Sequence, residues 1–140
     1  MPANKVDNLH FLRGSILVVA GHDADYLSIK SPDEQKRLDV LAESTLRNFP
    51  PIEVHTLGEA PGWVSAVRKA AKQLRIKCYP LPTLLSFMDL IQSIDVVYVL
   101  WDGESGSNLL EIVRRAKLHT RPVVNVWPLW EGSTDMFEDV

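Results

Sequence analysis

Short segments rich in β-branched and aromatic residues alternate along the chain with stretches whose apolar residues recur at helical spacing. The strand-like segments are residues 15–20, 52–56, 76–79, 94–101 and 123–127. The first and fourth contain nearly continuous apolar runs, which are typical of parallel strands buried on both faces. The alternation with four helical stretches predicts an α/β fold, a single-domain three-layer sandwich with a five-stranded, mainly parallel sheet.

The helical stretches have recognisable start signals. Ser31, Pro32 and Glu34 predict a helix start, because they supply a cap, a proline at the first helical position and a capping-box acid. Asn108 and, three residues later, Glu111 form a similar pair that opens a helix extending to about residue 118. The helix expected at 84–91 is apolar on more than one side, so it is either deeply buried or the surface of a homodimer.

Polar, glycine-containing loops follow three of the predicted strands. Right-handed crossovers place such loops along one rim of a parallel sheet. A reversal of strand order between the first and fourth strands would bring the loops together as a ligand crevice, in a Rossmann-like layout. The candidate binding residues are Gly21, His22 and Asp23 in the first loop, Gly58 and Gly62 in the second, and Asp102, Gly103, Ser105, Gly106, Ser107 and Asn108 in the third.

The third loop joins a buried strand to a helix start. This geometry directs backbone N–H groups and the positive helix end toward an anion, most often a phosphate. The glycines of the second loop would let the backbone approach a ligand closely, and Trp63 is either a platform for a base or a core residue. The plainer alternatives are that residues 22–25 are solvated loop positions and that Glu111 only caps Asn108.

Composition and charge narrow the classes of function. The 140 residues, 46% hydrophobic and 24% charged, are those of one ordinary globular domain. We expect an N-terminal arm at 1–14, a Rossmann-like domain at 15–128 and an acidic tail at 129–140. The net charge of −3 argues against a nucleic-acid partner.

Cysteine usage and hydropathy point to a cytoplasmic protein. A single cysteine excludes an intramolecular disulfide and fits a reducing compartment. No apolar run has the length of a membrane span, and the N-terminal residues lack the apolar core of a signal peptide. Asp23 and Asp25 have no third ligand at a telling spacing, so we expect neither a metal nor another cofactor.

Two loops resemble a known superfamily. The segment W-D-G-E-S-G-S-N-L-L-E at 101–111, followed by R-P-V-V-N-V, resembles the last βαβ unit of the SLOG-type Rossmann-like proteins. These include the lonely-guy phosphoribohydrolases, the lysine-decarboxylase-like proteins and the DNA-processing protein DprA. G-E-A-P-G-W at 58–63 resembles their second-strand loop, and the last unit is also similar to that of nucleoside 2-deoxyribosyltransferases.

The resemblance implies a nucleotide-like small-molecule ligand and a catalytic role for Glu111, because the signature Gly-Thr-x-x-Glu corresponds here to Ser107-Asn108-x-x-Glu111. Two features depart from the phosphoribohydrolase pattern: the Gly-Thr pair is absent, and the helix at 84–91 has no arginine. We therefore expect binding of a nucleotide or nucleotide derivative first. The alternatives are an N-glycosidic hydrolase or ribosyl transferase acting on a nucleoside monophosphate, and a non-catalytic interaction domain that uses the tail and the 84–91 helix.

Overall fold

A computed structural model describes residues 15–48, 50–58, 61–104, 107–132 and 138–139. Within them, strands and helices alternate as the hydrophobic pattern predicts. The strands are β1 (Ile16–Gly21), β2 (Glu53–Leu57), β3 (Lys77–Leu81), β4 (Val96–Leu100), β5 (Val123–Asn125) and β6 (Glu138–Asp139). The helices are α1 (Pro32–Asn48), α2 (Trp63–Gln73), α3 (Leu84–Leu90), α4 (Ser107–Leu118) and α5 (Trp127–Trp130).

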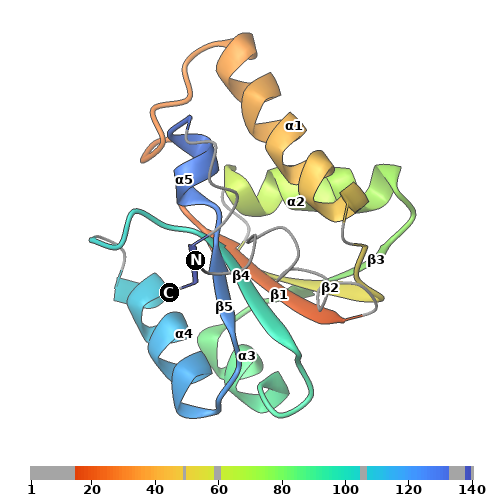
Figure 1. Cartoon of the computed structure of the whole chain (residues 1–140), viewed down its shortest axis with the longest axis vertical. Coiled ribbons are helices and arrows are strands. Elements are labelled where there is room, and N and C mark those ends of the chain that lie inside the picture. Colours follow the sequence, from red (N-terminus) through yellow and green to blue (C-terminus); the bar gives the residue numbers. More distant parts are fainter. Residues whose placement is uncertain (1–14, 49, 59–60, 105–106, 133–137, 140) are drawn as a thin grey trace, which may run out of the picture.

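The strand order in the sheet is β3-β2-β1-β4-β5-β6. The first five strands in this order pair in parallel, which confirms the predicted fold class of a Rossmann-like sandwich. Successive strands lie to one side of β1 up to β3, and the chain then crosses to the other side at β4. The strand order therefore reverses between β1 and β4, whose carboxyl ends lie side by side (Figure 1).

The three layers pack together through two apolar cores, one on each face of the sheet. One face of the sheet packs against α1, α2 and α5, with Leu38, Val67 and Tyr98 among its fully buried side chains. The other face packs against α3 and α4 around Phe87 and Ile112. Figure 1 shows the two helical groups on opposite sides of the sheet. All five side chains of β4 are buried, which agrees with the continuous apolar composition expected of a central parallel strand.

Of the two helix starts predicted from local signals, the one at Ser31 is confirmed and the one at Asn108 is displaced toward the N-terminus. The Ser31 hydroxyl accepts a hydrogen bond from the Glu34 backbone N–H at 3.2 Å, which is the first half of the predicted capping box. The Glu34 carboxylate accepts from the Ser31 hydroxyl at 3.1 Å, whereas a complete capping box uses the Ser31 backbone N–H. Thr83 caps α3 by accepting from the Ser86 N–H. Helix α4 instead begins at Ser107, so Asn108 lies inside its first turn rather than at the N-cap.

The helix at 84–91 supplies mainly core residues. Phe87 and Ile91 are buried, and Leu84, Met88 and Leu90 pack partly against the same core. Leu85 is the large apolar residue that stays outside, with 70% of its surface exposed. The apolar character on several sides of this helix is thus explained mostly by burial.

Part of the expected tail belongs to the folded body. Trp130 is buried, and its ring lies 4.0 Å from the Arg37 guanidinium of α1, a cation–π contact. Strand β6 pairs antiparallel with β5, so it covers that edge of the sheet. The expected N-terminal arm at 1–14 lies outside the described residues, as do 133–137. None of the described helices combines the length and the hydropathy needed to cross a membrane.

Candidate functional site

His22 lies at the reversal of strand order and is the centre of the candidate site. Its backbone N–H donates to the Leu100 carbonyl at 3.1 Å, which extends the contact between β1 and β4 by one residue. The imidazole is 4% exposed, and its Nε2 accepts the backbone N–H of Asp102 at 3.1 Å. A side chain from the first loop is therefore joined to the backbone of the third.

The hydrogen-bond geometry determines the state of the His22 ring. Because Nε2 accepts a hydrogen bond from the Asp102 backbone N–H, the neutral ring carries its own proton on Nδ1. Burial lowers the pKa of His22 below its ordinary 6.5, against the opposing influence of the Asp102 and Asp23 carboxylates. A protonated ring would instead direct an Nε2–H toward the Asp102 Oδ1, which lies 3.3 Å away. At neutral pH, we take His22 as an uncharged acceptor.

Tyr26 and Trp127 enclose the imidazole. The Tyr26 ring stacks on His22 with 3.9 Å between ring centroids, and the Trp127 ring meets it edge to face at 5.9 Å. The Tyr26 hydroxyl donates to the Asp102 Oδ2, and the Tyr26 backbone N–H donates to the Asp23 Oδ1 at 2.8 Å. The result is an aromatic and acidic cluster across the ends of β1, β4 and β5, in which Tyr26 is 46% exposed.

Asn125 connects the third loop to the last strand. Its buried carboxamide donates to the Trp101 carbonyl at 2.7 Å and accepts the Trp101 N–H at 3.2 Å. The same Oδ1 also accepts the Trp127 N–H at 3.0 Å. The Asn125 side chain thus fixes the backbone positions of Trp101, which precedes Asp102, and of Trp127, which contacts His22.

The second loop lies against the first through Gly62. A Cβ built on Gly62 would lie 2.6 Å from both the Asp23 Cα and the His22 carbonyl oxygen. Backbone hydrogen bonds join the loops here, from the Ala24 N–H to the Pro61 carbonyl and from the Trp63 N–H to the His22 carbonyl. The close backbone approach that a glycine permits is therefore made at this position by the protein's own first loop.

Gly21 and Trp63 belong to the same contact. A Cβ on Gly21 would lie 2.6 Å from the Trp63 Cδ1, so this glycine makes room for the indole. Trp63 is fully buried and packs against Tyr98 at 5.5 Å between ring centroids. Of the two alternatives for Trp63, a core residue is therefore correct. Gly58 has a φ of +99°, a backbone conformation that favours glycine, and a Cβ added there would meet no atom within 4 Å.

The third loop is described up to Glu104. The Asp102 Oδ1 accepts the Glu104 backbone N–H at 3.0 Å, which forms a tight turn through Gly103, where φ is +84°. Ser105 and Gly106 lie outside the described residues, and the side chain of Ser107 is likewise not described. Asn108 is exposed in the first turn of α4.

Glu111 is engaged by two arginines of its own helix. Its carboxylate lies 3.2 Å from the Arg114 guanidinium and accepts from the Arg115 Nε at 3.0 Å. These are i,i+3 and i,i+4 pairs, the spacings at which side chains meet on a helix surface. The structural role expected for Glu111, a cap of Asn108, is replaced by these ion pairs.

Three residues of the cluster are absent from the sequence-based candidates: Tyr26, Asn125 and Trp127. Asn125 had a signal, because a carboxamide inside an otherwise apolar strand must find hydrogen-bond partners. Tyr26 and Trp127 carried no such signal, since an aromatic residue in the segment after a strand is equally consistent with core packing.

Metal ligation finds no support among the described residues, which contain no group of three or more His, Cys, Asp or Glu side chains able to hold an ion. Comparison with models of protein families and with curated proteins finds no match to this chain.

Proposed function

We propose that the protein binds a nucleotide or nucleotide derivative in the crevice between the loops that follow β1 and β4, without a requirement for turnover. The observation that supports this most is the cluster of His22, Tyr26, Asp102 and Trp127, built across the point where strand order reverses. Ligands of open α/β sheets bind at such points, beyond the carboxyl ends of the strands.

The chemistry of the cluster suggests how such a ligand would lie. Tyr26 is rigidly stacked on His22 and half exposed, so its ring can receive a base. The carboxylates of Asp23 and Asp102 accept hydrogen bonds and suit sugar hydroxyls better than phosphate oxygens, which they would repel. We therefore assign the phosphate to the far side of Asp102, at the N-terminus of α4.

The ion pairs of Glu111 favour binding over glycosidic chemistry. A nucleophilic carboxylate must approach the sugar carbon, and Glu111 is held by Arg114 and Arg115 on the surface of α4. Each carboxylate oxygen of Glu111 faces one of these guanidinium groups, which stabilises the ionised form and lowers its nucleophilicity. Binding places no such demand on Glu111.

Ligand binding is tested with nucleoside monophosphates and NAD in thermal-shift and calorimetric titrations. Replacing Tyr26 by leucine should weaken binding about tenfold, since stacking on an aromatic side chain contributes roughly 1–3 kcal/mol. Tyr26→Phe should retain most of the affinity, because it keeps the ring. The chain offers a matched control in Tyr79, which is 43% exposed and stacks on His55 at 5.2 Å between ring centroids. Tyr79 lies on the edge strand β3, which β2 separates from β1.

Tyr79→Leu should leave the affinity unchanged. Equal losses in the Tyr26→Leu and Tyr79→Leu variants, or no binding of any member of the panel by folded protein, would refute the proposal. Chromatography of the same mixtures for released base separates binding from catalysis. Release that Glu111→Gln abolishes would replace the binding proposal by an N-glycosidic enzyme.

A further inference from the structure

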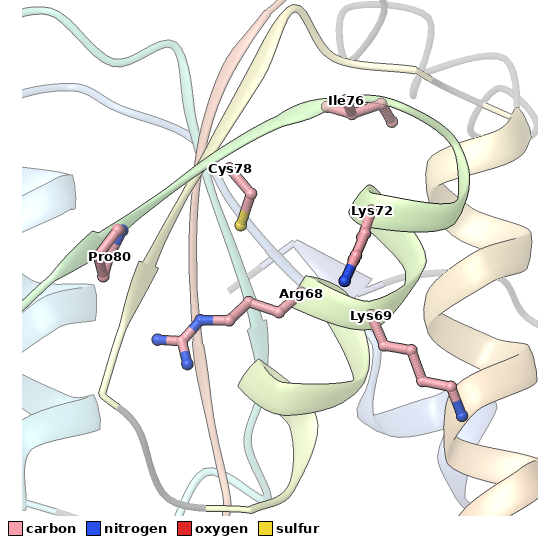
Figure 2. A pocket seen from close by; sticks show the side chains of 6 residues that line it. All are labelled: Arg68, Lys69, Lys72, Ile76, Cys78 and Pro80. Atoms are coloured by element: carbon pink, nitrogen blue, oxygen red, sulfur yellow. The ribbon is translucent and has the colours of Figure 1, made fainter.

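A cavity lies between α2 and the edge strand β3 (Figure 2). Its volume is about 710 Å³, within the roughly 300–1,000 Å³ typical of sites for small molecules. The lining side chains are Arg68, Lys69, Lys72, Ile76, Cys78 and Pro80. None of these residues belongs to the cluster around His22.

Arg68 provides a fixed positive charge in this cavity. Its Nε donates to the Thr56 Oγ1 at 3.1 Å, and one terminal nitrogen donates to the Gly58 carbonyl at 2.9 Å. These bonds orient the guanidinium but use only two of its five N–H donors. Both acceptors are neutral, so the charge of Arg68 is not compensated by them.

Lys72 adds a second cation from the next turn of α2. Among the residues that the structure describes, no carboxylate lies within ion-pair distance of Arg68 or Lys72. Lys69 differs, because its amine pairs with Asp39 of α1 at 2.9 Å, and Figure 2 shows its side chain directed away from β3. The cavity therefore holds two cations that an anion can neutralise.

The opposite wall is apolar. Ile76 precedes β3, and Cys78 and Pro80 follow at alternate positions, so these side chains share the sheet face on which α2 lies. Figure 2 shows the Cys78 sulfur directed from the strand toward Arg68. Because β3 is the edge of the sheet, this face has α2 on one flank only, which leaves the wall accessible.

We propose that this cavity binds a small amphiphilic anion, with a phosphate or carboxylate head between Arg68 and Lys72 and an apolar body along Ile76, Cys78 and Pro80. Arginine and lysine are the usual partners of such oxyanions, and the orientation of Arg68 is already fixed by Thr56 and Gly58. The site is independent of nucleotide binding in the crevice.

Cys78 is the single cysteine of the chain and gives the site its own reporter. The rate of alkylation by iodoacetamide, a neutral reagent that does not compete for the cations, is measured against the concentration of octyl phosphate below its micellar range. We expect saturable slowing of the reaction. Octanol and inorganic phosphate, each half of the probe, should slow it far less at the same concentrations.

Substitutions identify the residues responsible. The Arg68→Gln/Lys72→Met double variant should weaken the protection at least about tenfold, since two charge-assisted hydrogen-bonding partners are lost. Lys72→Met alone should weaken it about threefold and leaves the bonds of Arg68 intact, so it tests the site even if the double variant folds poorly. Lys77→Met is the matched control, because Lys77 lies on the same strand and its side chain alternates to the other face.

Each contrary outcome overturns the proposal. Equal protection by octanol would show an apolar cavity without anion recognition. Protection that persists in folded Lys72→Met and in the double variant, or that Lys77→Met reduces equally, would show that the cations do not hold the head group. No slowing by octyl phosphate would show that the cavity does not take this class of ligand.

Discussion

The contact between the first and second loops can be tested by adding one methyl group to Gly62. In the Gly62→Ala variant, the new Cβ would lie 2.6 Å from the Asp23 Cα and the His22 oxygen and 2.8 Å from the Ala24 nitrogen. All three are backbone atoms, so no side-chain rotation relieves the clash. The loops must separate, and the two backbone hydrogen bonds between them lengthen or break.

The expected loss has two components. Backbone strain at a φ of +150° costs about 2 kcal/mol for a residue with a Cβ. Overpacking against rigid neighbours adds about 2 kcal/mol, so Gly62→Ala should lower the free energy of unfolding by about 4 kcal/mol. Gly132 provides the matched control, because its φ is +91° and a Cβ there meets nothing within 4 Å. Gly132→Ala should therefore show the strain component alone, about 2 kcal/mol.

Urea unfolding followed by tryptophan fluorescence measures both variants. The smaller entropy of the unfolded chain when alanine replaces glycine is common to the two and cancels in the comparison. With a denaturant dependence of about 2 kcal/mol per molar urea, the midpoint of Gly62→Ala should lie about 1 M below that of Gly132→Ala. Coincident midpoints would refute the inference that the second loop is held against the first at Gly62.

Three further predictions concern the site and the surface. Burial lowers the pKa of His22 below 6.5 in the folded protein. As the pH falls, the unfolded chain therefore binds a proton at His22 at a higher pH than the folded chain does. The stability that the neutral ring contributes is complete above about pH 6.5 and is lost as the pH falls through the folded pKa. His22→Gln, which keeps an acceptor, should flatten the unfolding free energy between about pH 7 and 5; an unchanged pH dependence would contradict this. Asn125→Leu should lower the unfolding free energy by about 3 kcal/mol, because it removes the hydrogen bonds that the buried carboxamide makes to the Trp101 and Trp127 backbones. A loss under about 1 kcal/mol in urea titrations would show that Asn125 is not the connection. If the protein forms a homodimer through the 84–91 helix, Leu85→Glu should convert it to monomer in sedimentation equilibrium, whereas an unaltered mass would exclude this surface.

The fold was predictable because its signals are local and periodic. The apolar run of β4 and the helix start at Ser31 each depend on residues within a few positions of one another. The reversal of strand order was only a condition of the prediction, because the general rules of connection fix the handedness of crossovers and not the order of the strands. Those rules place the loops along one rim whatever their side chains are.

The site was predictable only as a region. His22 and Asp102 were both candidates, but their contact joins positions 80 residues apart and depends on the orientation of one ring. Gly62 was recognised as a position where another group approaches the backbone closely. The sequence does not show that this group is the first loop of the protein rather than a ligand. For Glu111, arginines at both i+3 and i+4 compete with Asn108 for the carboxylate, and the start of α4 at Ser107 decides in their favour.

The Asn125 carboxamide couples the motion of the third loop to that of the segment after β5. Since the same oxygen accepts from Trp101 and from Trp127, any displacement of the carboxamide disturbs both hydrogen bonds at once. Opening is then a concerted event, and the amide protons of the two tryptophans should exchange with solvent at closely similar rates. A ligand that stabilises either the third loop or the segment after β5 should therefore slow hydrogen exchange at both tryptophans.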